Sequence, residues 1–324
     1  MRVYITRNIP QPAIDLLQEH GLDVSINKHN TLLSKEALIA ACQDADLLFN
    51  VGNADLDAEF LEACKHLKGI ALASVGYDHI QLAQASKYNI AVSNTPDVLS
   101  GATADTAFLL MLAVSRKAFY RADEIRRGQW KEFEYMKDLG QELNGKTLGI
   151  YGLGRIGIEL AKKAKGAYNM DIIYHNRGRN TAGEKLLDAQ YVNFDELLTR
   201  SDVLSVHSFL SPETEYRFNA AAFKRMKSTA IFINTARGKI HQEQDLIAAL
   251  QAGDIWGAGL DVTDPEPMLS NNPLLSMPNA CILPHIGSAT LETRTQMAIM
   301  ASNNLIAVKN GHRMPQILNP EIYA

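Results

Sequence analysis

Four polar residues stand where a chain of alternating strands and helices would place its chemistry. His207, Arg237, Asp261 and His285 each end or follow a short apolar run with strand character. Ligands of parallel sheets bind at the carboxyl ends of the strands, so these side chains are candidates for one site. An imidazole exchanges a proton near neutral pH and a guanidinium binds anions. These residue types therefore suit acid–base chemistry beside a bound anion.

His285 stands apart from the other histidines in the chain. It follows Pro284 and precedes Ile286-Gly287-Ser288, so a rigid turn lies beside a flexible one. This arrangement fixes the backbone of His285 and lets a substrate approach it closely. His207 has a similar position at a strand end, and geometry alone leaves it as a rival.

A carboxylate held between two prolines lies between Asp261 and His285, in the segment Asp264-Pro265-Glu266-Pro267. The prolines preset an extended loop. Two interpretations of Glu266 stay open. In the first, Glu266 simply lies in a solvated surface turn. In the second, its carboxylate orients a histidine and favours the protonated form of that histidine. Spacing does not choose between them.

A glycine motif predicts a dinucleotide-binding loop. Gly152, Gly154 and Gly157 form the pattern GxGxxG, with a short apolar strand before it and helical spacing after it. Gly152 permits the tight turn, Gly154 lets the backbone approach a pyrophosphate, and Gly157 lets the helix pack against the strand. The amides of Arg155 and Ile156 would then point toward phosphate oxygens at the positive end of the helix.

The tip of the next strand decides which dinucleotide is expected. An NAD site would place a carboxylate there for the ribose hydroxyls. Asp171 starts the strand instead, at the wrong end, and His175 and Asn176 occupy the tip, followed by Arg177 and Arg179. Without a carboxylate to repel it, a 2′-phosphate can be bound by guanidinium groups. We therefore expect Asn176 and Arg177 to contact the cofactor and NADP(H) to be preferred, with NAD(H) possible. The alternative is that the arginines only solvate a loop.

Short strands and helices alternate along the chain and must position these residues. Strand character occurs at residues 3–6, 47–50, 70–74, 90–93, 147–151, 171–175, 203–207, 230–234, 257–261 and 281–284. Helical spacing occurs at residues 12–20, 34–42, 54–66, 81–88, 100–116, 156–167 and 289–310. The alternation predicts parallel sheets with right-handed crossovers, and the six strands from residue 147 on fit one doubly wound dinucleotide-type domain. Thr235 and Asp261, at two later strand ends, are also expected to contact the dinucleotide.

Composition excludes several classes of protein. The chain has 324 residues, 46% of them hydrophobic, and 32 Lys and Arg against 36 Asp and Glu give a net charge of −4. This charge argues against nucleic-acid binding. The longest apolar run, residues 107–114, falls far short of the roughly 20 residues of a membrane span. The first segment, MRVYITRNIP, has basic residues interleaved with apolar ones and no long apolar core, so it is not expected to be a secretory signal. Three widely spaced cysteines favour neither a disulfide framework nor a metal site. We expect a cytoplasmic enzyme of about two domains, without metal.

Four motifs in register resemble the D-isomer-specific 2-hydroxyacid dehydrogenases. They are GLGRIG at 152–157, NTARG at 234–238, GLDVTDPEP at 259–267 and LPHIGSAT at 283–290. Their order and spacing are similar to that family from about residue 45 to residue 313. The segments SVGYD at 74–78, NTPDVL at 94–99 and HIGSAT at 285–290 look most like its glyoxylate and hydroxypyruvate reductase branch, which includes 2-ketogluconate reductases.

The resemblance implies a role for each site residue. Arg237 would bind the carboxylate and the 2-oxo group of the substrate, His285 would donate the proton, and Glu266 would pair with His285. The backbone amides of Val75 and Gly76 would hold the carboxylate from the other domain. NAD-using members of the family carry an acidic residue at the second-strand tip, so the departure at residues 175–177 supports NADP(H).

The resemblance also implies an α/β fold of two doubly wound parallel-sheet domains. A Rossmann cofactor domain, residues 98–287, would be inserted in a split, flavodoxin-like substrate domain, residues 1–97 plus 288–324. A homodimer is expected through the apolar helix at residues 100–116. From the residues alone, that helix is internal core at least as readily as interface.

The expected activity is NADPH-dependent reduction of glyoxylate, hydroxypyruvate or 2-ketogluconate to the D-2-hydroxy acid. A D-lactate or phosphoglycerate dehydrogenase is the alternative within the family. The lack of a regulatory domain after Ala324, and of Lys or Arg at residues 50–53, weighs against the phosphoglycerate type. A non-catalytic dinucleotide-sensing scaffold or corepressor is the alternative outside enzymes. It would need only the glycine loop, so Arg237, Glu266 and His285 together favour chemistry.

Overall fold

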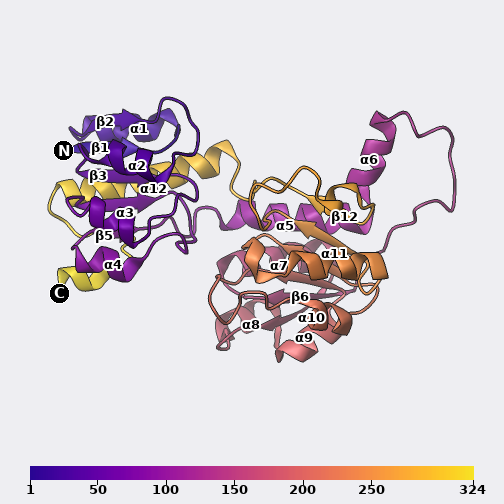
Figure 1. The fold of residues 1–324 in the computed structure, drawn as a ribbon. Helices are drawn as coiled ribbons and strands as arrows, with labels where there is room; N and C mark the ends of the chain where they lie inside the picture. The colour runs from indigo at the N-terminus through magenta and orange to yellow at the C-terminus, as the bar shows by residue number, and fades with distance from the viewer. The chain divides into compact units, whose positions relative to one another are not determined.

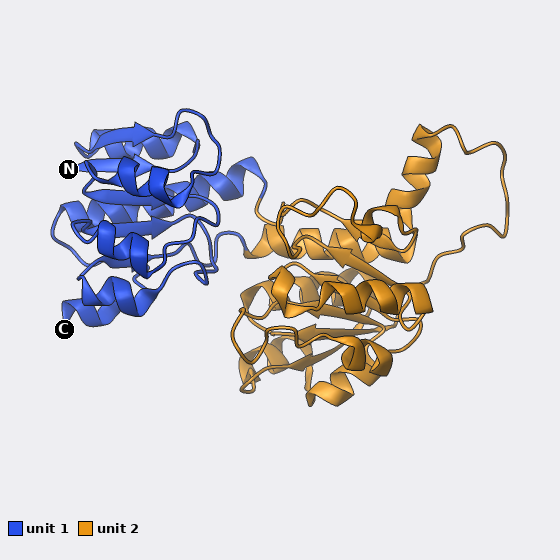
Figure 2. Cartoon of the chain, viewed as in Figure 1, with its two compact units in different colours: residues 1–99, 289–324 blue, residues 100–288 orange.

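The computed structural model describes all residues, 1–324, and divides them into two compact units. Unit 1 combines Met1–Leu99 with Ala289–Ala324, and unit 2 is the continuous segment Ser100–Ser288 (Figure 2). Each unit is built around its own parallel sheet.

Unit 1 is a five-stranded sheet with helices on both faces. Its elements are β1 (Arg2–Ile5), α1 (Gln11–Glu19), β2 (Asp23–Ile26), α2 (Lys35–Cys42), β3 (Leu47–Asn50), α3 (Ala58–Ala63), β4 (Gly69–Leu72), α4 (Leu82–Lys87), β5 (Ala91–Ser93), α12 (Leu291–Lys309) and the 3-10 helix η3 (Pro320–Tyr323). The strand order is β2-β1-β3-β4-β5, all parallel, which is the flavodoxin-like order.

The C-terminal segment completes unit 1. Helix α12 lies among the N-terminal elements (Figure 1), and its Leu305 shares a core with Leu17 of α1 and Val3 of β1. Beyond it, the amide of Asn319 accepts a hydrogen bond from the Val92 backbone N–H at 2.9 Å and donates one to the Ile90 carbonyl at 2.8 Å. The edge strand β5 is therefore held by the other end of the chain.

Unit 2 is a seven-stranded parallel sheet. Its elements are α5 (Ser100–Ser115), α6 (Ala118–Arg126), β6 (Thr147–Tyr151), α7 (Arg155–Tyr168), β7 (Asp171–His175), α8 (Thr181–Leu187), β8 (Gln190–Tyr191), α9 (Phe194–Arg200), β9 (Val203–Val206), α10 (Ala220–Arg225), β10 (Ile231–Asn234), η1 (Gly238–Ile240), α11 (Glu243–Ala252), β11 (Gly257–Leu260), η2 (Pro273–Ser276) and β12 (Ala280–Ile282). The order β12-β11-β10-β9-β6-β7-β8 is the Rossmann order with one additional strand. The predicted fold class, two doubly wound parallel α/β sheets, is confirmed.

The predicted elements differ from the structure mainly at sheet edges. Strands β2 and β8 were not predicted, because β2 is a short edge strand with no fully buried side chain and β8 has two residues. The helix expected over residues 54–66 is shorter. The Asp57 side chain accepts a hydrogen bond from the Phe60 backbone N–H at 3.0 Å and fixes the start of α3 there.

Helix α5 is a core helix of unit 2. Ten of its residues are buried within the single chain, among them Ala104, Leu110 and Val114. The structure thus supports the interpretation of this helix as internal core, and the expected dimer contact through it stays a prediction; its Leu109 is 48% exposed. Further large exposed apolar side chains lie at residues 125–139. Figure 1 shows α6 and the segment after it projecting from the rest of unit 2.

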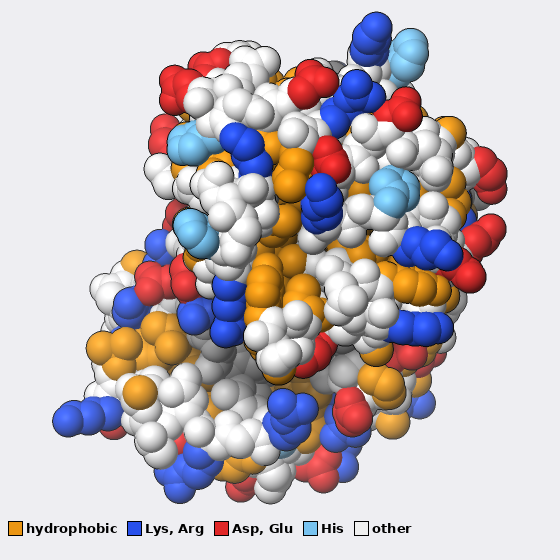
Figure 3. Space-filling view, turned by 90° about the vertical axis from the view of Figure 1, so that its left-hand side faces the viewer, with side chains coloured by type: hydrophobic (Ala, Val, Ile, Leu, Met, Phe, Trp, Pro, Cys, Tyr) orange, Lys and Arg blue, Asp and Glu red, His pale blue; other side chains and the backbone are white.

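Charged side chains of both signs are mixed on the face shown in Figure 3, without a patch of one sign. This distribution matches the small net charge of −4. Among the helices, none has the combination of length and apolar character that spanning a membrane would need.

Candidate active site

Three adjacent strands of unit 2 carry the predicted catalytic residues at their carboxyl ends. Arg237 follows β10, Glu266 lies in the loop after β11, and His285 follows β12. These strands are neighbours in the sheet, in the order β12-β11-β10. Parallel strands end at one edge, so the fold brings together three residues that are far apart in sequence.

His285 and Glu266 form a direct pair. The His285 Nδ1 atom lies 2.6 Å from Glu266 Oε1, and both side chains are partly exposed, at 38% and 29%. Burial alone would raise the pKa of Glu266, but the hydrogen bond and charge of His285 outweigh it and leave the pKa below its ordinary value. The charge of Arg237 also lowers the pKa of Glu266. Of the two interpretations of Glu266, the structure favours the carboxylate that orients a histidine.

The backbone around His285 is held by Asp261. Its two carboxylate oxygens accept hydrogen bonds from the Ile286 and Gly287 backbone N–H groups, each at 2.7 Å, and its side chain is buried. His285 itself has a left-handed φ of 55°, a backbone conformation that is uncommon for residues other than glycine. Asp261 was predicted to contact the cofactor, and that role stays a prediction. The contacts seen here position the His285 loop.

Arg237 lies on a loop that is packed tightly against the Glu266 loop. A Cβ atom on Gly238 would clash with the carbonyl group of Thr263, so the close approach of these two loops requires glycine. On the other side, the amide of Asn234 donates a hydrogen bond to the Arg237 carbonyl at 2.8 Å. The Arg237 guanidinium is thereby close enough to Glu266 for its positive charge to lower the pKa of that carboxyl group.

His207, the geometric rival, is unsuited to donating a proton. Its Nε2 atom lies 2.9 Å from Ser205 Oγ, inside the sheet edge. Desolvation lowers the pKa of His207 to about 4, so its imidazole is neutral at neutral pH.

The glycine loop has the shape of a phosphate cradle. A Cβ on Gly152 would lie 2.7 Å from the Ser208 backbone nitrogen, and one on Gly157 would lie 2.8 Å from the Gly152 carbonyl oxygen. Gly154, the N-cap of α7, instead faces open space, with no atom within 4 Å of such a Cβ. The backbone N–H groups at the start of α7, from Arg155 onward, lie next to this opening. The loop therefore fits a pyrophosphate at the helix N-terminus.

Unsatisfied hydroxyl groups mark the same edge of the sheet. Thr235 Oγ1, after β10, and Ser208 Oγ, after β9, are buried and have no hydrogen-bond partner within the chain. Buried polar atoms are normally paired, so the two hydroxyls suit contacts to a bound dinucleotide. Thr235 was predicted as a cofactor residue; Ser208 was missed, although it too directly follows an apolar strand.

The residues at the tip of β7 divide into two groups. Asn176 braces the glycine loop, because its amide accepts a hydrogen bond from the Leu153 N–H at 2.6 Å and donates one to the Leu153 carbonyl at 3.3 Å. Arg179 forms a bidentate pair with Glu184, at 3.0 and 2.7 Å. Arg177 is exposed. The pKa of Glu213 is lowered mainly by a hydrogen bond from Ser211, and the charge of Arg177 makes a smaller contribution in the same direction. Of the two arginines, Arg179 is the one held in a bidentate ion pair.

The predicted substrate residues of unit 1, Val75 and Gly76, lie in a loop after β4. The Ser74 hydroxyl donates a hydrogen bond to the Gly76 carbonyl at 2.7 Å, and the Asn94 amide donates one to the Val75 carbonyl at 2.8 Å. The carbonyl groups of this loop are thus held by neighbouring side chains.

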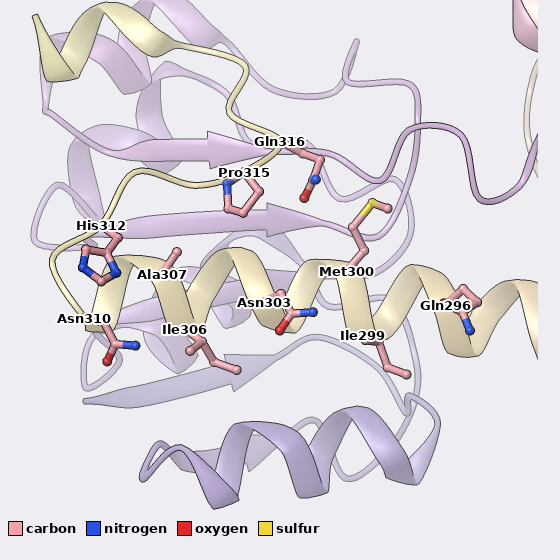
Figure 4. Close-up of a pocket in the computed structure, with 10 residues that line it drawn as sticks. All are labelled: Gln296, Ile299, Met300, Asn303, Ile306, Ala307, Asn310, His312, Pro315 and Gln316. Carbon is pink, nitrogen blue, oxygen red and sulfur yellow. The ribbon is translucent and has the colours of Figure 1, made fainter.

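Other features of the chain lie away from these residues. A hollow of about 530 Å³ runs along α12, where His312, Pro315 and Gln316 face Met300 and Asn303 (Figure 4). No predicted site residue lines it. The three cysteines are free and buried, and no group of three or more His, Cys, Asp or Glu side chains is arranged to hold a metal ion.

Comparisons with known proteins agree with the fold. Residues 108–287 match the family model described as D-isomer specific 2-hydroxyacid dehydrogenase, NAD binding domain. The glyoxylate reductase of Pyrococcus furiosus is 42% identical over 325 residues, covering 99% of this chain and 96% of that protein. A crystal structure of a protein from Thermus thermophilus is 42% identical with a TM-score of 0.92, covering 98% of this chain and 100% of that one. A glyoxylate reductase from Paecilomyes thermophila is 33% identical with a TM-score of 0.87 and 99% coverage of both chains.

The fold, the glycine loop and the His–Glu pair define an oxidoreductase that uses a nicotinamide dinucleotide. The chain belongs to the D-isomer-specific 2-hydroxyacid dehydrogenase family, and its relatives place it in the glyoxylate reductase branch. The resemblance seen in the motifs is confirmed. As a member of this family, the protein is an enzyme that reduces a 2-keto acid, and the non-catalytic scaffold is not supported.

The open space at Gly154 gives a test of the phosphate cradle. We expect Gly154→Ala to leave the thermal unfolding temperature unchanged, since no atom lies within 4 Å of the new Cβ. The added methyl group would instead meet the pyrophosphate and raise the Kd for the dinucleotide about tenfold or more. Fluorescence titration measures the Kd. Gly166→Ala, also without a close neighbour but within α7, is the matched control and should bind normally. Unchanged binding by Gly154→Ala would place the phosphates elsewhere.

Proposed function

We propose that this protein reduces a small 2-keto acid, namely glyoxylate, hydroxypyruvate or 2-ketogluconate, to the D-2-hydroxy acid with NADPH. The observation that carries the proposal is the 2.6 Å contact between His285 Nδ1 and Glu266 Oε1, beside the Arg237 loop. This contact commits Nδ1 to the carboxylate and leaves Nε2 as the atom of His285 that can meet a substrate. Unit 1 would bind the substrate and unit 2 the dinucleotide.

The chain's own residues would work as follows. When bound, the reduced dinucleotide supplies a hydride to the carbonyl carbon of the keto acid. The Arg237 guanidinium holds the carboxylate and the 2-oxo oxygen, and stabilises the negative charge that develops on that oxygen. The imidazolium of His285 donates its Nε2 proton to the same oxygen, which completes the hydroxyl group. The Glu266 carboxylate accepts the Nδ1 hydrogen bond and keeps the ring oriented. In the reverse reaction, neutral His285 removes the hydroxyl proton.

Two groups outside this set would assist binding. We assign the glycine loop, Gly152 to Gly157, to the pyrophosphate and Thr235 to the cofactor, in line with its unsatisfied hydroxyl. The amides of Val75 and Gly76 would bind the substrate carboxylate.

A substrate panel assayed with both NADPH and NADH tests this function. It should contain the three proposed substrates with pyruvate and phosphohydroxypyruvate, which represent the lactate and phosphoglycerate alternatives. We expect the highest kcat/KM with a proposed substrate and NADPH. No turnover across the panel with either dinucleotide would refute the function.

The preference for NADPH should depend on Arg177. In Arg177→Ala, we expect kcat/KM with NADPH to fall about tenfold, since a charge-assisted contact to the 2′-phosphate is lost, while the value with NADH stays nearly constant. Lys224→Ala also removes one positive charge, from α10, which lies in the chain between β9 and β10 rather than after β7, and it should change neither value. An equal or higher wild-type kcat/KM with NADH would contradict the preference.

We further propose a homodimer formed through residues 125–139 of α6 and the segment after it. At least half of each of the side chains of Ile125, Trp130, Phe133, Tyr135, Met136 and Leu139 is exposed in the single chain. Several large exposed apolar side chains in one short segment are typical of a protein interface, even though charged residues stand between them here. Sedimentation velocity should give a dimer. A Trp130→Ser, Phe133→Ser, Met136→Ser triple variant should sediment as a folded monomer, and a monomeric wild type would contradict the proposal.

A further inference from the structure

A buried histidine lies directly behind the loop that carries Arg237. His241 is completely buried, and its ring packs against Phe232 with the ring centroids 5.8 Å apart. Its Nδ1 atom lies 3.0 Å from the amide nitrogen of Asn234. No step assigned to His285, Glu266 or Arg237 uses this histidine.

The hydrogen bonds of Asn234 determine how His241 must be protonated. Asn234 Oδ1 accepts from the Ala236 N–H at 2.9 Å, and Nδ2 donates to the Arg237 carbonyl at 2.8 Å. This pair of contacts fixes which atom of the amide is nitrogen. The second hydrogen on Nδ2 faces His241 Nδ1, so Nδ1 must be the acceptor and the ring must be neutral with its hydrogen on Nε2. Burial keeps it so, because it lowers the pKa of His241 to about 4.

The geometry points to His241 as a positioning residue for Arg237. By accepting a hydrogen bond from Asn234, it locks the amide that holds the Ala236 N–H and the Arg237 carbonyl, and so sets the direction of the guanidinium. This inference rests on the proposed role of Arg237 as the clamp for the substrate carboxylate. It adds a residue that touches neither substrate nor cofactor.

Two observations separate this role from ordinary core packing. His241 Nε2 is buried without a hydrogen-bond partner, which an apolar ring of the same size would avoid. His241 also stands on a rigid segment, since the Phe218 N–H donates to the Ile240 carbonyl at 3.1 Å and the Gln242 N–H donates to the Phe218 carbonyl at 2.9 Å. A fixed acceptor on a rigid segment is what the adjoining loop, residues 235–237, needs for a defined orientation.

Two substitutions at one position distinguish positioning from packing. His241→Phe keeps the bulk of the ring and removes the acceptor. His241→Asn loses volume but places a carbonyl oxygen near the position of Nδ1. We expect His241→Phe to raise the KM for the keto acid about five- to tenfold, with the Kd for NADPH unchanged. We expect His241→Asn to keep a KM within about twofold of wild type, although its cavity lowers the unfolding temperature more. A packing role predicts the opposite order in KM, and that order would overturn the inference.

Oxalate binding to the enzyme saturated with oxidised dinucleotide gives a second readout that needs no turnover. Oxalate presents a carboxylate and a further oxygen but cannot accept a hydride. Calorimetry should show weaker oxalate binding for His241→Phe and near-normal binding for His241→Asn. If the wild type binds oxalate but reduces no keto acid, the proposed function fails while these Kd values still decide the role of His241. If the wild type binds no oxalate, the clamp role of Arg237 and this inference both fail.

Discussion

The His285→Ala variant is expected to reduce its keto acid with a kcat about 10²–10⁴ lower than wild type, the range that a general acid contributes. The reason is the Nδ1–Glu266 contact of 2.6 Å, which orients the ring so that only Nε2 remains to protonate the carbonyl oxygen. Alanine provides no proton in its place. The KM for the keto acid and the Kd for NADPH should change little, because Arg237 and the glycine loop carry binding. Steady-state and single-turnover kinetics measure these quantities.

The control for this prediction is the other histidine at a strand end. His207→Gln keeps a polar group near Ser205 and should retain most of the wild-type kcat. His207 has a pKa lowered to about 4 and is therefore neutral at the pH of the assay. If kcat falls as much in His207→Gln as in His285→Ala, the assignment of His285 as the proton donor is wrong.

The Arg237→Lys variant should chiefly raise the KM for the keto acid, by about 10–100-fold. An ammonium group keeps the positive charge but does not form two parallel hydrogen bonds to a carboxylate and a 2-oxo group. A smaller fall in kcat should accompany the change, because the charge on the carbonyl oxygen is also stabilised less well. Initial rates over a range of keto-acid concentrations, at saturating NADPH, measure both values.

Arg225→Lys is the matched control, since Arg225 makes an exposed ion pair with Asp195 at 3.1 Å. It should leave KM unchanged. A wild-type KM in Arg237→Lys would contradict the clamp assignment and, with it, the positioning role of His241.

The motifs predicted which candidate residues come together because strand ends in a parallel sheet share one edge. The glycine pattern between strand and helix predicted β6 and α7, and the proline-flanked turns predicted loops bearing Glu266 and His285. Spacing did not show whether Glu266 meets a histidine, because β11 and β12 are brought side by side only by the sheet order. The 2.6 Å contact depends on that order.

Sequence alone is less informative about what a polar side chain at the edge actually contacts. Asp261 and Asn176 stand at the predicted edge, yet their hydrogen bonds go to backbone groups at residues 286–287 and 153. Asn234 and His241 were not predicted at all. The only sequence signal for this pair was Asn234, a polar residue at the end of the apolar strand β10. Its partner His241 lies after a short turn, which hydrophobic patterning does not predict.

The split of unit 1 between the two ends of the chain has a consequence for synthesis on the ribosome. The first 99 residues emerge without α12, which supplies part of the core against α1 and β1. At about 5–20 residues per second, residues 100–288 take roughly 10–40 s to be made before α12 can follow. Unit 2, being continuous, can fold in that interval, whereas the N-terminal sheet keeps an uncovered apolar face until translation nears its end.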